Sequence, residues 1–241
     1  MDTDGKNLYD RTRLLVGDEA MERFAAVRVI LFGVGGVGSW CAEALVRSGI
    51  LHLTLVDPDC VDITNINRQL PATTLTVGRP KVEVMRERLL AINPEADIVI
   101  RQEAYTSESA STFPLEQYDY VVDAIDSLKD KLELILATTH NPQNTLFSSM
   151  GAARKMDPLQ VRVTEFWRVD GCPLAASLRK RMRRAQRFPE RKFKCVWSPE
   201  RCETALPSGT LMPVTATFGL TLASLILKDC KDRRRDALQG V

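Results

Sequence analysis

"VRVILFGVGGVGSW" (residues 27–40) is the stretch of sequence that decides the fold. Its first half is a short, largely apolar and β-branched run, which is typical of a buried strand. Gly33, Gly35 and Gly38 follow in G-x-G-x-x-G register, ahead of a helix that we expect to end near Gly49. Glycines let the backbone approach a phosphate, and a helix N-terminus presents N–H groups to it. The stretch therefore predicts a nucleotide site; the alternative is glycines that serve only helix–strand packing.

The chain around this turn alternates between strand and helix patterns. The order β-α-β-α-β-β-α-β predicts an α/β fold, a Rossmann-like doubly wound and mostly parallel sheet. A segment rich in Pro, Cys and charge, in which no strand or helix is predicted, runs to about Pro213, and the tail after Lys228 is expected to fray. Strands are expected over residues 27–33, 51–57, 97–103, 118–126, 145–151 and 160–166, and helices over residues 7–26, 38–49, 78–94, 128–140, 172–186 and 214–227.

The composition is that of one globular domain. Of 241 residues, 44% are hydrophobic and 27% charged, with a net charge of +2. We expect a single domain with an N-terminal helical segment (1–26), a nucleotide-binding core (27–150) and a C-terminal extension that contacts substrate (151–241). The six cysteines contain no CxxC pair, which argues against a disulfide framework and a cysteine-based zinc site. No secretory signal or transmembrane segment is predicted, so we expect a cytoplasmic protein.

The polar run "DITNINRQL" (residues 62–70) distinguishes ATP from NAD as the nucleotide. Arg68 lies in this run, and Lys81 follows at the start of an amphipathic helix. Hydride transfer has little use for two such cations, whereas a triphosphate needs them for binding and for the charge that develops during transfer. Each residue also has an alternative interpretation when it is considered alone. Lys81 could be a solvated charge on a helix, and Asn65 and Asn67 could be turn residues.

Two aspartates complete the predicted nucleotide site. Asp57 ends the second strand, roughly 20 residues after the glycine turn, where an acid can bind a ribose hydroxyl. Asp126 ends a later strand, at the carboxyl edge where doubly wound sheets bind ligands. One carboxylate together with phosphate oxygens is a typical Mg²⁺ site. ATP and Mg²⁺ are therefore the predicted ligands.

Several motifs together resemble a known family. "GVGGVGS", "VDPDCVDITNINRQL", "VGRPKVEVMRERLLAINP" and "VVDAIDS" are similar to the adenylation fold shared by ubiquitin-activating enzymes and bacterial activators of ubiquitin-like sulfur carriers. Within that superfamily, "RTRLLVG", "DPLQVRVTEF" and "PVTATFG" resemble the tRNA threonylcarbamoyladenosine dehydratases. The resemblance implies nucleotide-binding roles for Gly33, Gly35, Gly36, Gly38, Asp57, Asn65 and Gln69, catalytic roles for Arg68, Lys81, Asp126 and Arg11, and Mg²⁺ binding by Asp126. It implies that Arg11 reaches the ATP of a partner subunit, hence a homodimer.

The resemblance implies ATP-dependent cyclisation of threonylcarbamoyladenosine in tRNA through a carboxyl-adenylate. The alternative is adenylation of the C-terminus of a ubiquitin-like or sulfur-carrier protein, against which the missing CxxC pairs count. An oxidoreductase is supported only by the glycine turn, and Arg68, Lys81 and Asp126 argue against a catalytically silent tRNA-binding module. Cys202 is a candidate nucleophile whose alternative is a plain loop thiol. A sulfur-relay protein is a partner that the sequence leaves open.

The block "RKRMRRAQRFPERKFK" (residues 179–194) is almost entirely basic, with Glu190 its lone acid. A charge run is by default a solvated face, but such a block repels itself unless it meets a polyanion. We therefore predict contact with the tRNA backbone, with membrane-surface binding as the rival. The predicted tRNA contacts are Arg179, Lys180, Arg183, Arg184 and Arg187, with Phe188, Phe193 and Trp197 as candidates for base stacking.

Overall fold

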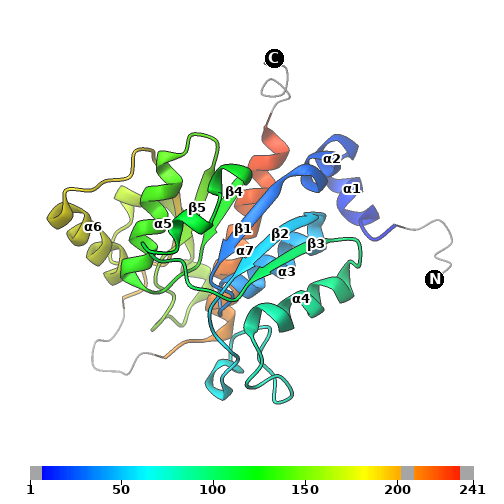
Figure 1. The fold of residues 1–241 in the computed structure, drawn as a ribbon, viewed down its shortest axis with the longest axis horizontal. Coiled ribbons are helices and arrows are strands. Elements are labelled where there is room, and N and C mark those ends of the chain that lie inside the picture. Colours follow the sequence, from blue (N-terminus) through cyan, green and yellow to red (C-terminus); the bar gives the residue numbers. More distant parts are fainter. Residues whose placement is uncertain (1–6, 202–208, 234–241) are drawn as a thin grey trace.

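A seven-stranded sheet forms the centre of the computed structural model, which describes residues 7–201 and 209–233 (Figure 1). The strand order is β3-β2-β1-β4-β5-β7-β6, and every neighbouring pair is parallel except β6 and β7. The predicted Rossmann-like, mostly parallel α/β sheet is thus confirmed. The strands are β1 (Arg28–Phe32), β2 (His52–Val56), β3 (Asp97–Arg101), β4 (Tyr120–Asp123), β5 (Thr145–Ser149), β6 (Arg162–Glu165) and β7 (Lys194–Trp197).

Helices cover both faces of the sheet. Buried side chains of α2, α3, α4 and α7 form one apolar cluster with one face, and those of α5 and α6 form a second cluster with the other. The burial of both faces explains why β1, β2 and β4 are nearly continuous apolar runs in the sequence. The helices are α1 (Asp10–Val16), α2 (Asp18–Ala26), α3 (Gly38–Ser48), α4 (Lys81–Ile92), α5 (Leu128–His140), α6 (Pro173–Ala185) and α7 (Met212–Asp232).

Three local predictions were wrong. The single helix expected over residues 7–26 is two helices, because Gly17 between them has φ +84° and ends α1. The segment after α6 contains the short strand β7, which inserts between β5 and β6. The tail after Lys228, which was expected to fray, is helical as far as Asp232, and the Asp229 carboxylate accepts a hydrogen bond from Tyr120 Oη at 2.9 Å. Residues 234–241 lie outside the described residues.

Helix α7 packs closely against α3, and this contact depends on Gly219. A Cβ atom there would lie 2.3 Å from the carbonyl oxygen of Val37 and 2.9 Å from the backbone nitrogen of Cys41. The close approach brings the start of α7, with Thr215, beside the glycine turn. In the described part of the chain, no helix combines the length and the apolar character that crossing a bilayer requires.

Candidate nucleotide-binding site

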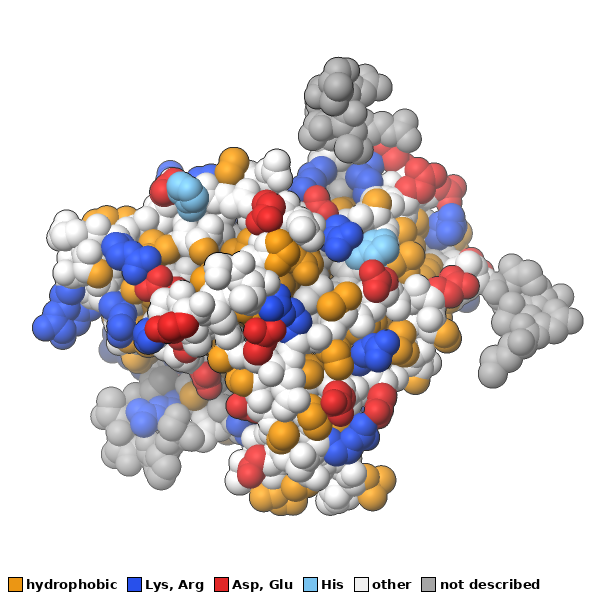
Figure 2. Space-filling model, viewed as in Figure 1, with side chains coloured by type: hydrophobic (Ala, Val, Ile, Leu, Met, Phe, Trp, Pro, Cys, Tyr) orange, Lys and Arg blue, Asp and Glu red, His pale blue; other side chains and the backbone are white. Residues whose placement is uncertain are grey.

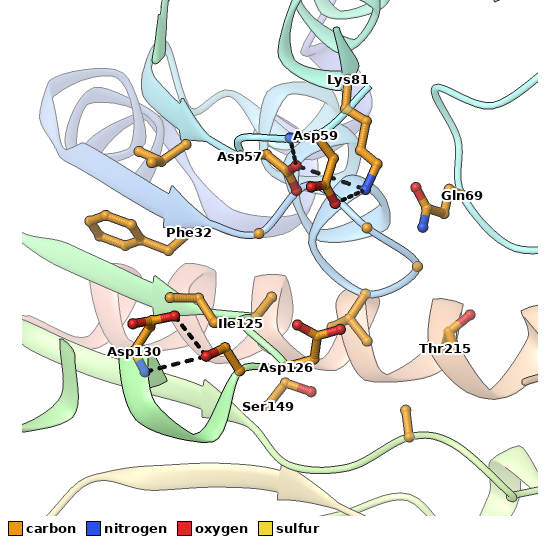
Figure 3. Close-up of a pocket in the computed structure, with 18 of the residues that line it drawn as sticks. Phe32, Asp57, Asp59, Gln69, Lys81, Ile125, Asp126, Asp130, Ser149 and Thr215 are labelled. Atoms are coloured by element: carbon orange, nitrogen blue, oxygen red, sulfur yellow. Dashed lines mark hydrogen bonds and ion pairs between the residues drawn. The ribbon is translucent and has the colours of Figure 1, made fainter. Parts of the chain in front are cut away.

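A cavity of about 400 Å³ opens at the carboxyl ends of β1 and β4. The strand order reverses between these two strands, which is where doubly wound sheets bind their ligands. The loops after β2 and β5 and the first turn of α7 complete its wall (Figure 3). Eight of the predicted nucleotide-site residues line it, namely Gly33, Gly35, Gly36, Asp57, Arg68, Gln69, Lys81 and Asp126.

The glycines of the turn have two different tasks. Gly33 has φ +92°, and a Cβ atom on it would lie 2.6 Å from the carbonyl oxygen of Ala124. A Cβ on Gly38 would lie 1.8 Å from the carbonyl oxygen of Gly33. These two close the turn, and Gly38 itself does not line the cavity, whereas Gly35 and Gly36 do. The N-terminus of α3 carries no side-chain cap, although the N–H groups of Ser39 and Cys41 already donate to the carbonyls of Gly35 and Val37. Such a helix N-terminus favours a phosphate beside it.

Asp57 holds the glycine turn from behind. Its Oδ2 accepts a hydrogen bond from the backbone N–H of Val34 at 2.6 Å, and its Oδ1 accepts one from Asp59 at 2.9 Å. Burial raises the pKa of the Asp57 carboxyl, and the nearby charge of Lys81 opposes that rise. The carboxylate oxygens retain lone pairs for a ribose hydroxyl, so Asp57 can position the turn and bind the sugar together.

Lys81 is buried in the cavity wall and already has acidic partners. Its Nζ lies 2.7 Å from Oδ2 of Asp59 and 3.8 Å from Oδ1 of Asp57, and the residue is 5% exposed (Figure 3). Sequence reasoning passed over Asp59, although its place two residues after Asp57 was a visible signal. The two carboxylates hold the Lys81 side chain in place at the edge of the cavity.

The polar run places two of its side chains in the cavity and uses a third to shape the turn. Asn65 does not line the cavity: its Oδ1 accepts the Asp62 N–H at 3.2 Å and closes a capping box on a short 3₁₀ turn. Arg68 lines the cavity, where its Nη1 donates to the carbonyl of Thr64 at 2.9 Å. The Oε1 of Gln69 is buried without a hydrogen-bond partner among the described residues. Such an unpaired polar atom on a cavity wall fits a polar ligand.

Asp126 lies exposed on the opposite wall of the cavity, beyond the end of β4. It has no side-chain partner among the described residues, so both carboxylate oxygens are available. Below it, the buried Lys131 donates to Oδ1 of Asp123 and to the carbonyl of Ile125, each at 2.8 Å. Sequence reasoning missed this fully buried ion pair, which anchors the loop that presents Asp126.

One of the predicted catalytic residues lies elsewhere. Arg11 is exposed on α1 and does not line this cavity, so any contact with a nucleotide would have to be made in another subunit. Cys202 lies outside the described residues. Among the five described cysteines only Cys60 is exposed.

The predicted tRNA contacts divide into two groups. Nη1 of Arg179 donates to the carbonyls of Phe166 and Val169, and Arg187 forms a bidentate pair with Glu133 at 2.7 and 2.8 Å. The other three, Lys180, Arg183 and Arg184, are exposed and have no partner within the described part of the chain. Figure 2 shows basic side chains gathered over α6, at the end of the molecule where Figure 1 places that helix.

Only one of the three aromatic candidates for base stacking is exposed. Phe193 and Trp197 are buried, at 5% and 6% exposure, because they belong to β7 and the loop before it. Phe188 is exposed, and so is Trp167, which the sequence analysis did not single out. Their ring centroids lie 6.4 Å apart, so the two rings form one open aromatic surface beside α6.

Known proteins resemble the chain over nearly its full length. The model of the ThiF family matches residues 9–239. A tRNA threonylcarbamoyladenosine dehydratase of Haemophilus influenzae is 37% identical, over 87% of each chain, and its namesake in Escherichia coli is 36% identical over 96% of each. The crystal structure of the E. coli enzyme TcdA in complex with ATP superposes with a TM-score of 0.88, at 37% identity, and covers 96% of each chain. With its family model matched almost end to end and relatives this similar, the chain belongs to the ThiF family.

Proposed function

We propose that the protein uses ATP to dehydrate threonylcarbamoyladenosine in tRNA to its cyclic form. The observation that carries the proposal is the cavity, in which a glycine turn, Arg68, Lys81 and a free Asp126 carboxylate surround one space. The relatives named above bear that activity in their names, and the similar E. coli structure holds ATP.

The first step activates a poor electrophile. A carboxylate does not lose oxide at neutral pH, so the threonyl carboxylate attacks the α-phosphorus of ATP. The bond from that phosphorus to the bridging oxygen breaks, and pyrophosphate leaves. Arg68 and Lys81 lie where they can stabilise the charge on the phosphates, and the fixed position of Lys81 costs no reorganisation at that moment. The product is an acyl-adenylate.

The second step closes the ring. The carbamoyl group attacks the activated carbonyl, loses a proton and expels AMP, so the net change is the loss of one water from the nucleoside. Because both reacting groups belong to one substituent, holding them in one cavity makes the step intramolecular. Free water would compete for the same acyl-adenylate, so the carbamoyl group must be held close to the activated carbonyl.

Asp126 fits a Mg²⁺ site. A single unpaired carboxylate facing the phosphate end of a nucleotide cavity suits an ion whose other ligands are phosphate oxygens and water. When bound, the ion neutralises charge on the leaving pyrophosphate. The described residues hold no cluster of three acidic, histidine or cysteine side chains, so nucleotide oxygens would supply the remaining ligands.

We also propose that the protein acts as a homodimer in which Arg11 reaches the nucleotide of the partner subunit. In support, Arg11 is exposed and without a partner among the described residues, and the same helix exposes Leu14 and Leu15 at 80% and 82%. Apolar side chains as exposed as these are typical of an interface. Mixing Arg11→Ala protein with protein that carries Arg68→Ala should recover part of the lost activity if sites are shared, because some mixed dimers then have one intact site.

The surface on α6 is the proposed tRNA contact. Lys180, Arg183 and Arg184 are available to backbone phosphates, while Trp167 and Phe188 offer an open face to an unpaired base.

A tRNA substrate and the absence of CxxC pairs are the reasons that we propose a cytoplasmic protein with reduced thiols. The proposal also includes a nucleophilic role for Cys202 and a sulfur-relay protein as a partner. If Cys202→Ala forms the cyclic product at an unchanged rate, the nucleophilic role is excluded.

Mass measurement of nucleosides tests the function. The protein is incubated with ATP, Mg²⁺ and tRNA that carries threonylcarbamoyladenosine, and the nucleosides are then weighed. Loss of one water from the modified nucleoside, with one AMP formed per cyclic product, is the expected result. An unchanged nucleoside together with pyrophosphate exchange that depends on a small carrier protein would establish the alternative adenylation of a carrier C-terminus.

A further inference from the structure

A second cavity, of about 460 Å³, adjoins the nucleotide cavity. The two share Gly151, Ala153 and Leu174, which come from the loop after β5 and the first turn of α6. The two cavities therefore lie side by side. We call the second cavity the acceptor pocket.

The acceptor pocket is cationic. Arg154, Lys155 and Arg201 line it, and no acidic residue does so in the described part of the chain. Lys155 is 2% exposed, and its only hydrogen-bond acceptor among the described residues is the backbone carbonyl of Glu200. The Glu200 carboxylate is taken up by backbone N–H groups of residues 156 and 157. A buried ammonium without a carboxylate partner is costly, and it retains two N–H donors for an anionic ligand.

Arg154 has a backbone conformation that favours glycine. Its φ is +60°, and its N–H donates to the carbonyl of Gly209 at 2.8 Å. Its side chain is exposed and has no partner among the described residues. Strain at a non-glycine residue persists where the surrounding structure imposes it, and such residues cluster at ligand sites. An arginine thus stands where glycine or asparagine would be easier to accommodate.

We propose that the acceptor pocket binds the carboxylate-bearing substituent of the substrate nucleoside and directs it to the nucleotide cavity. The inference rests on the proposed function. Arg154 and Lys155 supply charge-assisted hydrogen bonds to the carboxylate, while Pro173 and Leu174 offer apolar contact to the base. The volume is within the roughly 300–1,000 Å³ of small-molecule sites, which accommodates a purine taken out of the stack. The pocket thus distinguishes modified from unmodified tRNA.

The decisive variant is Arg154→Gly, because glycine removes the cation while relieving the backbone strain. Binding of tRNA with and without the threonylcarbamoyl group is measured in the presence of a non-hydrolysable ATP analogue. For the unaltered protein we expect the modified tRNA to bind more tightly. In Arg154→Gly that preference should fall about tenfold or more, as expected for a lost hydrogen bond between charged groups, while binding of unmodified tRNA and of the ATP analogue stays the same. Lys155→Met, which keeps the length of the side chain, should act in the same direction, and Arg154→Lys should retain part of the preference.

Lys228→Ala is the matched control, since it removes one exposed cation from α7, well away from the pocket. It should leave the preference unchanged. If Arg154→Gly weakens the binding of modified and unmodified tRNA equally, Arg154 binds a backbone phosphate, and this result would overturn the inference. So would a preference that survives in both Arg154→Gly and Lys155→Met. Neither result affects the proposed function, which fails only if the unaltered protein forms no cyclic nucleoside.

Discussion

The nucleotide cavity and the α6 surface both carry basic side chains, but they hold these charges in opposite ways. In and below the cavity wall, Lys81 and Lys131 are buried, and each is paired with a carboxylate within 2.8 Å. On α6, Lys180, Arg183 and Arg184 are exposed, with no partner among the described residues. Buried, paired charges fix a position, whereas exposed charges contribute to a field that no single residue dominates. Loss of one cavity charge should therefore be severe, and loss of one surface charge should be mild.

The largest effect is expected below the cavity, at Lys131. Lys131→Met leaves the Asp123 carboxylate buried without its counter-ion, which should lower the free energy of unfolding by about 3–5 kcal/mol. Urea denaturation followed by circular dichroism measures the change. Lys129→Met, on the same helix but half-exposed and 3.9 Å from Glu108, is the control and should change stability by about 1 kcal/mol or less. Similar losses in both variants would contradict the idea that burial separates the two regions.

The next effect is catalytic and concerns Arg68. Arg68→Ala should lower kcat by about 100- to 1,000-fold, the range found when one fixed donor to a charged transition state is removed. The dissociation constant for tRNA should stay unchanged, because the α6 surface is separate from this wall of the cavity. Arg79→Ala controls for a general loss of charge, since Arg79 is paired with Glu87 and does not line the cavity. Equal loss of tRNA binding and turnover in Arg68→Ala would mean that the polar loop is misassigned.

The sequence predicted the nucleotide half of the molecule well because its signals are local. The glycine turn and the alternating apolar runs specify strand, turn and helix within a few residues of one another. The helix expected over residues 7–26 is interrupted at Gly17, which has a positive φ. A glycine can adopt a positive φ but need not, so its presence alone did not predict the break. The strand β7 was missed because four residues are too few to show a period, and its stability comes from pairing with β5 and β6.

The sequence also could not predict which polar side chains pair with one another, because this pairing depends on contacts between residues that are distant in the chain. The pairs Lys131–Asp123 and Lys81–Asp59 span 8 and 22 residues, and only the folded sheet brings the second pair together at the cavity. The same limit explains why Asn65 was assigned to the nucleotide, although its side chain caps a turn. Residue type predicted which side chains are polar, but not whether each one faces a ligand or another part of the chain.

A smaller and graded effect is expected on α6. The combined variant Lys180→Ala, Arg183→Ala, Arg184→Ala should weaken tRNA binding and flatten its salt dependence. The slope of log K against log salt should fall by about 2–3, since each cation that releases a counter-ion contributes roughly 0.7–0.9. The kcat at saturating tRNA should be unchanged. An unaltered slope in titrations from low to moderate salt would exclude this surface as the tRNA contact.

Arg187 provides the finest test, because the sequence does not distinguish it from Arg184. Its guanidinium is already held by both oxygens of Glu133, so the pair adds little net charge to the surface. Arg187→Ala should therefore leave the salt slope for tRNA unchanged and lower the unfolding free energy by about 1 kcal/mol or less, whereas Arg184→Ala should reduce the slope by a fraction of a unit to about one. If the two variants reduce the slope equally, Arg187 must exchange Glu133 for a phosphate on binding, and its pairing in the free protein would not predict its role in the complex.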